Sequence, residues 1–253
     1  ASGELNGHVE LPMQGKAGLA ADLILKDLAL AGNALGDLSA KADERGEALY
    51  DLAVQLKNGA NTLDGKAAVD ASGPTAVING NANVDLKELG IFEPFTKAYL
   101  YELAGGLKGK LRFNMADGKS ALNGDLNFTD TRIGVLATRS LFKLDKERIT
   151  FDDAGIHLDN FAMRDSLGNL FTLNGDINTT HISDPILDLT LRTDSFQLVH
   201  SVRGDNDLFY GDVLAGLDLT ITGTAGLPKM KGDVHVLNGT TLSIVLPGSE
   251  VKM

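Results

Sequence analysis

A five-residue pattern, apolar-x-Gly-x-apolar, recurs from one end of the 253-residue chain to the other. Each copy lies in a segment that alternates apolar and polar residues, so its glycine falls on the apolar face of a strand. Repetition of one such strand predicts a long sheet with a single apolar face, unlike the compact core of an enzyme. The copies begin at Leu5, Leu63, Ile78, Leu107, Leu122, Leu173 and Met230.

The alternation is clearest in residues 107–115, where every second residue is apolar or glycine and the others are Lys, Arg or Asn. The stretch that follows contains Asp117 and Gly118, which suit the positive φ of a two-residue hairpin turn. Residues 122–128 then return with the same alternation, and similar patterns cover 76–86, 171–177, 187–191 and 217–221. With strands of about 5–10 residues, the chain should contain roughly 15 of them.

Helical spacing is confined to residues 87–103, where Pro94 is followed by Phe95, Ala98 and Tyr99, and predicts one short helix or lid. Helices are therefore too scarce to cover the apolar face, so the sheet has to cover itself. Glycine on that face in seven copies favours curvature, whereas a bulge or a position beneath a large cross-strand neighbour is the alternative.

We therefore predict an all-β fold, in which a long, strongly curved, one-faced sheet folds over into a trough with a hydrophobic interior and one short helical segment. This architecture is a β-taco, or repeating β-groove. A closed sandwich needs the same alternation and remains an alternative. We expect a repeated β-segment over 1–106, with the short helix near 87–103, and a second β-domain over 107–253. Together they are expected to form one continuous trough.

Composition excludes several functions. The net charge of −11 argues against nucleic acid, because phosphate binding requires a basic surface. The chain has no cysteine, which excludes disulfides and thiolate metal sites. Residues 1–10 lack the basic and apolar regions of a signal peptide, so we expect any leader or anchor to lie outside the sequence given.

No local pattern indicates catalysis or metal binding. The five histidines are scattered, and none lies two or four residues from another. The acidic groups Asp152-Asp153 and Asp205-Asn206-Asp207 lack the frame of a calcium-binding loop and indicate turns. We therefore predict that the protein is not an enzyme and has no catalytic residue, metal site or cofactor.

The interior of the predicted trough would be a surface for acyl chains. The apolar members of the alternating strands are its candidate lining residues: Leu63, Val69, Ile78, Val84, Leu107, Leu111, Phe113, Leu122, Leu126, Phe128, Phe171, Leu173, Ile177, Leu187, Leu189, Leu191, Leu217, Leu219, Ile221, Val234 and Val236.

The second half of the chain resembles a known family. The segment 204–212, with the sequence Gly-Asp-Asn-Asp-Leu-Phe-Tyr-Gly-Asp, leads into the strands at 217–224, 227–234 and 240–247. Residues 149–177, with Phe151-Asp152 and Arg164-Asp165-Ser166-Leu167, fit as well. From about Leu107 to Leu246, this sequence is similar to the C-terminal domain of the TamB family of AsmA-like envelope proteins, in the version typical of Bacteroidetes-type bacteria.

The resemblance implies a trough of β-strands that crosses the periplasm, in a parent protein anchored in the inner membrane. It also implies a BamA- or TamA-like outer-membrane barrel as a partner, and a role in outer-membrane biogenesis as part of the translocation and assembly module. The family usually continues past Leu246-Pro247, so we expect part of the partner-binding segment to be missing here.

The predicted function is a segment of a periplasmic lipid bridge. Phospholipid acyl chains would bind in the hydrophobic β-groove and move between the inner and outer membranes. The first alternative is a chaperone-like assembly factor for outer-membrane β-barrel proteins that acts through an exposed edge strand. The second alternative is a dry β-sandwich with a purely structural role.

Overall fold

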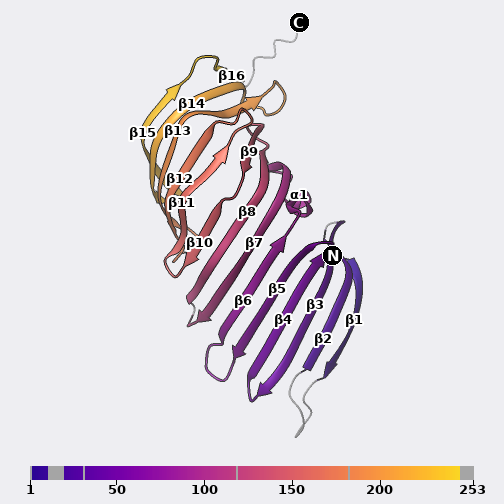
Figure 1. The fold of residues 1–253 in the computed structure, drawn as a ribbon. Coiled ribbons are helices and arrows are strands. Elements are labelled where there is room, and N and C mark those ends of the chain that lie inside the picture. Colours follow the sequence, from indigo (N-terminus) through magenta and orange to yellow (C-terminus); the bar gives the residue numbers. More distant parts are fainter. Residues whose placement is uncertain (1, 11–19, 31, 118, 182, 246–253) are drawn as a thin grey trace. The chain divides into compact units, whose positions relative to one another are not determined.

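The computed structural model describes residues 2–10, 20–30, 32–117, 119–181 and 183–245. Within them the protein has sixteen β-strands, one 3₁₀ turn and one short α-helix, which confirms the all-β prediction. The strands form one antiparallel sheet and follow sequence order from β1 to β15, except for β9 and β16 (Figure 1). β9 pairs with β8 and β11, whereas β16 pairs with β14.

The chain forms two compact units, which we describe separately. Unit 1 comprises the described residues of 1–91, 106–127 and 149–155. Its strands are β1 (Ser2–Glu10), β2 (Ala20–Leu30), β3 (Asn33–Gly46), β4 (Leu49–Asn58), β5 (Asn61–Asp70), β6 (Val77–Leu86) and β10 (Arg148–Asp152), together with parts of β7 (Leu100–Ala116) and β8 (Lys119–Val135).

Unit 2 comprises the described residues of 92–105, 128–148 and 156–253. It contains the remaining parts of β7 and β8, the helix α1 (Glu93–Thr96), β9 (Ser140–Leu144), β11 (Gly155–Arg164), β12 (Leu170–Asn178), β13 (Ile186–Ser201), β14 (Phe209–Thr224), β15 (Leu227–Val236) and β16 (Thr241–Ile244).

In unit 1, unbroken antiparallel register over most of each strand carries the sequence alternation from strand to strand. Residues directly opposite each other lie on the same face, so apolar residues line up in rows across β1 to β7. One row is Leu5–Leu25–Leu38–Leu56–Leu63–Val84–Gly109, and the next is Gly7–Leu23–Ala40–Val54–Gly65–Ala82–Leu111. A third is Val9–Ala21–Ala42–Leu52–Ala67–Gly80–Phe113.

Gly80 shows one role of glycine in the repeated pattern. It pairs directly with Phe113 in an unbroken register, so it is not a bulge. A Cβ atom at Gly80 would lie 2.2 Å from Cζ of Phe113, because the ring lies over the glycine. At this position the glycine therefore lies beneath a large cross-strand neighbour, which was one of the alternatives left open by the sequence.

Bulges occur elsewhere, at residues outside the repeated pattern. In β2 the register shifts between Leu25 and Leu28, where Asp27 has φ +50°. The Asp27 N–H donates to Oδ1 of Asp37 at 3.0 Å, which satisfies a backbone group that the bulge removes from the ladder. Because a bulge bends its strand, Asp27 marks a bend in β2.

The predicted short helix is present but ends earlier than the spacing suggests. It consists of the 3₁₀ turn η1 (Leu89–Phe92) and α1, and the prediction of helix beyond Thr96 is wrong. Leu100 already belongs to β7, and the N–H of Leu136 donates to the carbonyl of Tyr99 at 2.8 Å. Strand pairing therefore overrides the local helical spacing.

The hairpin predicted around Asp117 connects β7, which ends at Ala116, to β8, which begins at Lys119. Asp117 has φ +51°, as a tight turn requires. Gly118, the other residue of the predicted turn, lies outside the described residues, and so does the Leu246-Pro247 segment.

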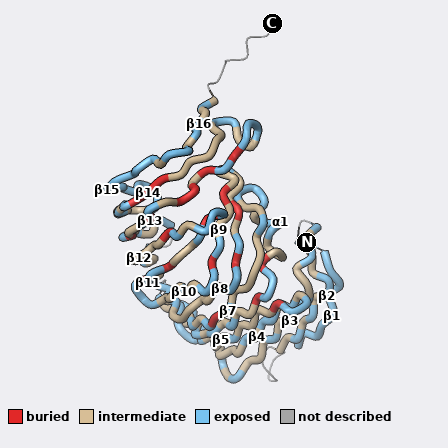
Figure 2. The backbone as a smooth tube through the Cα atoms, turned by 45° about the horizontal axis from the view of Figure 1, so that its top comes forward, coloured by how far each residue is buried: buried red, intermediate tan, exposed pale blue. Residues whose placement is uncertain are grey.

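Unit 2 contains a small aromatic core. Phe171, Phe196, Ala215 and Leu217 are buried together, and Phe142 of β9 stacks on Phe196 with ring centroids 5.5 Å apart. Phe196 follows a bulge in β13, where the register shifts after Thr193. Buried positions gather in β13 and β14 (Figure 2). This core covers part of the apolar face of unit 2.

Asp165 links the β11–β12 turn to β13. Its side chain is only 1% exposed and accepts hydrogen bonds from the N–H groups of Leu167 and Asn169, at 2.9 and 2.8 Å. It also accepts from the N–H of Gln197 at 2.7 Å. The Arg164–Leu167 segment of the predicted resemblance therefore has a structural role here.

Candidate functional site: an uncovered apolar face

The candidate site is the apolar face of unit 1, defined by the three rows across β1 to β7 given above. Several of its side chains are exposed, as shown by Leu5 at 66%, Val54 at 46% and Leu52 at 37%, and most of the others are half-buried. Among the described residues of unit 1, the only buried hydrophobic side chains are Leu86 and Leu89. Contiguous exposed apolar surface of this kind typically marks a binding surface.

The rows also contain small residues at regular positions. In the second and third rows, Ala or Gly stands at every second position or more often, next to larger residues such as Leu23, Val54 and Leu111. Small side chains leave space above the sheet, where a packed core would place large ones. At Gly80 the Phe113 ring occupies this space, whereas at Gly65 the nearest atom to an added Cβ would be 3.9 Å away.

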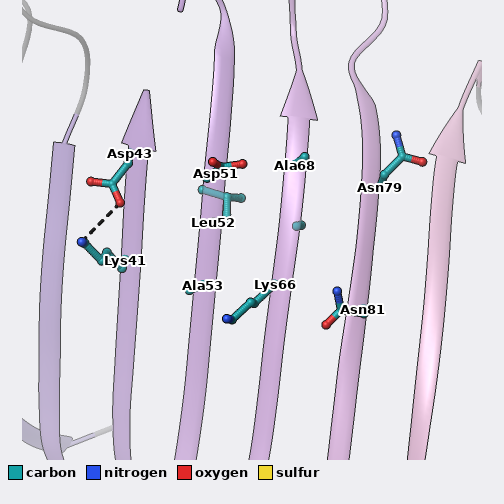
Figure 3. A pocket seen from close by; sticks show the side chains of 10 residues that line it. Lys41, Asp43, Asp51, Leu52, Ala53, Lys66, Ala68, Asn79 and Asn81 are labelled. Carbon is teal, nitrogen blue, oxygen red and sulfur yellow. Dashed lines mark ion pairs between the residues drawn. The ribbon is translucent and has the colours of Figure 1, made fainter. Parts of the chain in front are cut away.

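The opposite face of unit 1 is polar. A shallow hollow of about 410 Å³ lies over β3 to β6, and Lys41, Asp43, Asp51, Lys66 and Asn81 are among its lining residues (Figure 3). Nζ of Lys41 lies 3.4 Å from Oδ2 of Asp43, and both side chains are more than half exposed. Because charges of both signs line the hollow, it is a solvated outer surface without a preferred ligand charge.

Unit 2 continues the pattern of cross-strand rows. Leu173, Leu191 and Leu219 lie opposite one another on β12, β13 and β14, and Leu189 pairs with Ile221. At one end of these strands the aromatic core covers the face. At β15 the apolar side chains are again exposed, as shown by Met230 at 68% and Val234 at 55%.

The predicted lining residues lie on these two surfaces. In unit 1, the register places Leu63, Val69, Ile78, Val84, Leu107, Leu111 and Phe113 on the apolar face. Leu126 joins them, because a Cβ atom at Gly109 would lie 2.9 Å from its Cδ2 atom, and Leu122 is on the same side of β8. Phe128 belongs to unit 2 and makes an edge-to-face contact with Phe161 at 5.9 Å.

In unit 2, the structure aligns the other eleven predicted residues across β12 to β15. These are Phe171, Leu173, Ile177, Leu187, Leu189, Leu191, Leu217, Leu219, Ile221, Val234 and Val236. Phe171 and Leu217 are part of the buried core, whereas Val234 and Val236 are exposed. That these residues contact lipid remains a prediction.

Sequence reasoning missed the contribution of β2, β3 and β4. Leu25, Leu38 and Leu56 lie in the same row as the predicted Leu63. The alternation of residues 49–56 is a usable signal for β4. In β2, the bulge at Asp27 reverses the alternation within the strand and hides the pattern.

A polar clasp in unit 2 joins the turn before β9 to the loop before β14. Nε of Arg139 donates to Asp205 at 2.9 Å, and Nδ2 of Asn206 donates to the carbonyl of Ala137 at 2.9 Å. The N–H of Val202 and the Arg139 guanidinium hold the pKa of Asp205 below its usual range. The Asp205-Asn206 segment therefore forms a turn, as predicted, and has a structural role.

Tyr101 completes the clasp. Its hydroxyl donates to the carbonyl of Arg139 at 2.8 Å, and the Arg139 guanidinium lies 5.3 Å from the centroid of its ring. Burial raises the pKa of the Tyr101 hydroxyl, which keeps it protonated as a hydrogen-bond donor.

No cluster of three potential metal ligands and no helix long and apolar enough to cross a membrane occurs in the described ranges.

Comparison with known families identifies one part of the chain. Residues 159–253 match the TamB C-terminal domain, which confirms the predicted resemblance for this segment. The match begins within β11 and includes β12 to β16, whereas β1 to β10 lie outside it. The TamB family belongs to the cell envelope and is associated with the translocation and assembly module. No curated protein and no solved structure matches the chain.

Proposed function

We propose that the apolar face of unit 1 binds phospholipid acyl chains and that the chain is a segment of a periplasmic bridge for lipid between the inner and outer membranes. The observation that carries the proposal is an apolar surface that extends across seven strands with exposed or half-buried side chains and few buried ones. Similarity of residues 159–253 to a TamB domain supports a role in the cell envelope. The proposal involves no catalytic step, metal or cofactor.

The dimensions of the face suit acyl chains. Neighbouring strands lie about 4.8 Å apart, so a row across β1 to β7 extends roughly 30 Å. This length is similar to the hydrocarbon thickness of a bilayer, about 30 Å, which two acyl chains fill end to end. Each CH₂ group removed from water contributes about 0.8 kcal/mol wherever it lies on the face. A chain can therefore slide along the rows at little cost.

The test compares two adjacent positions on opposite faces of β4. Val54→Asp places a carboxylate on the apolar face, at a site that is already 46% exposed and so tolerates charge. Ala53→Asp places the same carboxylate on the polar face, where Ala53 pairs with Lys41 and Lys66. Each protein is expressed in the periplasm and purified without detergent, and its organic extract is analysed by mass spectrometry.

We expect stoichiometric phospholipid in the parent chain and in Ala53→Asp, and its loss in Val54→Asp. Circular dichroism and hydrogen exchange would establish that both variants are folded. Equal lipid in the two folded variants, or no lipid in the parent chain, would contradict the assignment of the face.

A second candidate function is assembly of outer-membrane β-barrel proteins, with a BamA- or TamA-like barrel as partner. It is favoured by β15, whose ten residues are all exposed. An incoming strand would add to this edge through main-chain hydrogen bonds, without using the apolar face of unit 1. Photocrosslinks from β15 to a barrel protein, combined with lipid-free extracts, would favour this function over lipid transport.

A further inference from the structure

The edge of the sheet at β15 has an unusual surface. β15 pairs with β14 from Leu227 to Val236 and has no second neighbour within the described part of the chain. Val236 is 67% exposed, whereas its partner Ala215 on β14 is 1% exposed. The apolar face of unit 2 therefore continues from a buried strand directly onto an open edge.

The sequence of β15 is self-complementary about Gly232. If two copies of β15 pair antiparallel with Gly232 opposite Gly232, Lys231 of each copy lies opposite Asp233 of the other. Met230 then lies opposite Val234, so apolar residues meet on one face and opposite charges on the other. Cross-strand pairs of both kinds stabilise antiparallel sheets. Within the described residues, neither Lys231 nor Asp233 forms an ion pair of its own.

The N–H and C=O groups of Gly232 point in the direction that this pairing requires. The N–H of Leu237 donates to the carbonyl of Leu214 at 2.9 Å, and these two residues are directly opposite in the register that pairs Gly232 with Leu219. Because hydrogen-bonded and non-hydrogen-bonded pairs alternate along an antiparallel ladder, Gly232, five residues from Leu237, is in a non-hydrogen-bonded pair with Leu219. In such a pair, the N–H and C=O of Gly232 point away from β14, toward the open edge. Two copies can therefore form a hydrogen-bonded pair at Gly232.

We propose that β15 is a homodimerisation edge, on which a second copy of this chain pairs antiparallel about Gly232. The arrangement has twofold symmetry, so it closes with two copies and does not propagate. It makes the apolar faces of the two copies continuous across the junction. A single strand pair is smaller than a standard interface of about 1,600 Å², so the dimer should be weak and dependent on concentration.

Charge exchange between copies tests the register. In Lys231→Asp, the introduced carboxylate of each copy faces Asp233 of the other, and in Asp233→Lys, two ammonium groups meet. Each variant alone should be monomeric, whereas an equimolar mixture should form heterodimers, because both cross-strand pairs then have opposite charges. Lys229→Asp is the matched control, since it places a carboxylate opposite His235 and should preserve the dimer. All these side chains are exposed, so folding should be unaffected.

Sedimentation velocity of the detergent-free chain from about 1 μM to about 1 mM covers the affinities expected for a small interface. The expected result is a reversible dimer that each single charge reversal abolishes and the mixture restores. A monomer at all concentrations, or a dimer that persists in Lys231→Asp, would overturn the proposal. Lipid in the extract reports separately on unit 1, so the two proposals can fail independently.

Discussion

Gly109 and Gly65 occupy equivalent places in the repeated pattern, yet they should respond differently to alanine. A Cβ atom at Gly109 would lie 2.0 Å from the carbonyl oxygen of Asp125 on β8, although real Cβ atoms keep at least 3.0 Å from their neighbours. The two strands would have to move apart by about 1 Å, which is enough to break hydrogen bonds of about 2.9 Å. At Gly65 the nearest atom, the carbonyl oxygen of Val54, is 3.9 Å away.

The expected difference in unfolding free energy is large. Overpacking costs about 1–3 kcal/mol, and each backbone hydrogen bond lost adds about 1 kcal/mol, so Gly109→Ala should destabilise unit 1 by about 3 kcal/mol. Gly65→Ala meets no obstacle and lowers the entropy of the unfolded chain, so it should stabilise the protein by about 0.5 kcal/mol. Neither glycine has a positive φ, and the comparison therefore isolates steric contact.

Urea unfolding followed by circular dichroism measures the total change, and hydrogen exchange of β7 and β8 peptides locates it. Exchange is needed because two units need not unfold in a single transition. Similar stabilities for the two alanine variants would refute the argument that the close approach of β7 and β8 requires glycine at position 109.

Three further predictions concern other parts of the molecule. Asp165→Ala should destabilise unit 2 by about 3 kcal/mol, because the buried N–H of Gln197 and the partly buried N–H groups of Leu167 and Asn169 lose their acceptor, and urea unfolding would measure it. In the folded protein, the pKa of the Asp205 carboxylate lies below its usual value of 3.8. The ionised carboxylate therefore stabilises the fold above pH 3.8, and this stabilisation is lost as the pH falls below that value. Hydrogen exchange at Val202 should accelerate over that range in the parent chain but not in Asp205→Asn. Under the proposed function, removal of lipid should destabilise unit 1 by RT ln(1 + [L]/Kd), which is about 2.7 kcal/mol at a free lipid concentration of 100 Kd. Hydrogen exchange should then accelerate in β2–β6, while β12–β14 remain protected.

The faces of the strands could be predicted from the sequence because antiparallel pairing preserves alternation. Once Leu63 is placed on the apolar face, an unbroken register also places Val84 and Leu56 there. The prediction needs only the period of two and the absence of bulges. For the same reason it succeeds in β5 to β7, where the repeated pattern is continuous.

The bulges and the aromatic core could not be predicted in this way. Asp27 interrupts β2 without an obvious turn signal, and Phe196 enters the core only because a bulge after Thr193 shifts the register of β13. Its contact with Phe142 joins residues that are far apart in the sequence. Alternation is identical in covered and uncovered strands, so it does not distinguish a core residue such as Leu217 from an exposed one such as Val54.

The contrast between the two units gives the strongest physical argument for a ligand on unit 1. In unit 2, a bulge and the stacked rings of Phe142 and Phe196 cover part of the apolar face, so this chain is able to build a packed core on the same strand pattern. Unit 1 has the same alternation but uses alanine and glycine at positions such as Ala40, Gly65 and Ala82. A purely structural sheet would gain stability from larger residues there, at about 25 cal/mol for each additional Å² buried. Small residues on an apolar face are favoured when another molecule supplies the missing volume, and a flexible hydrocarbon chain fits that requirement.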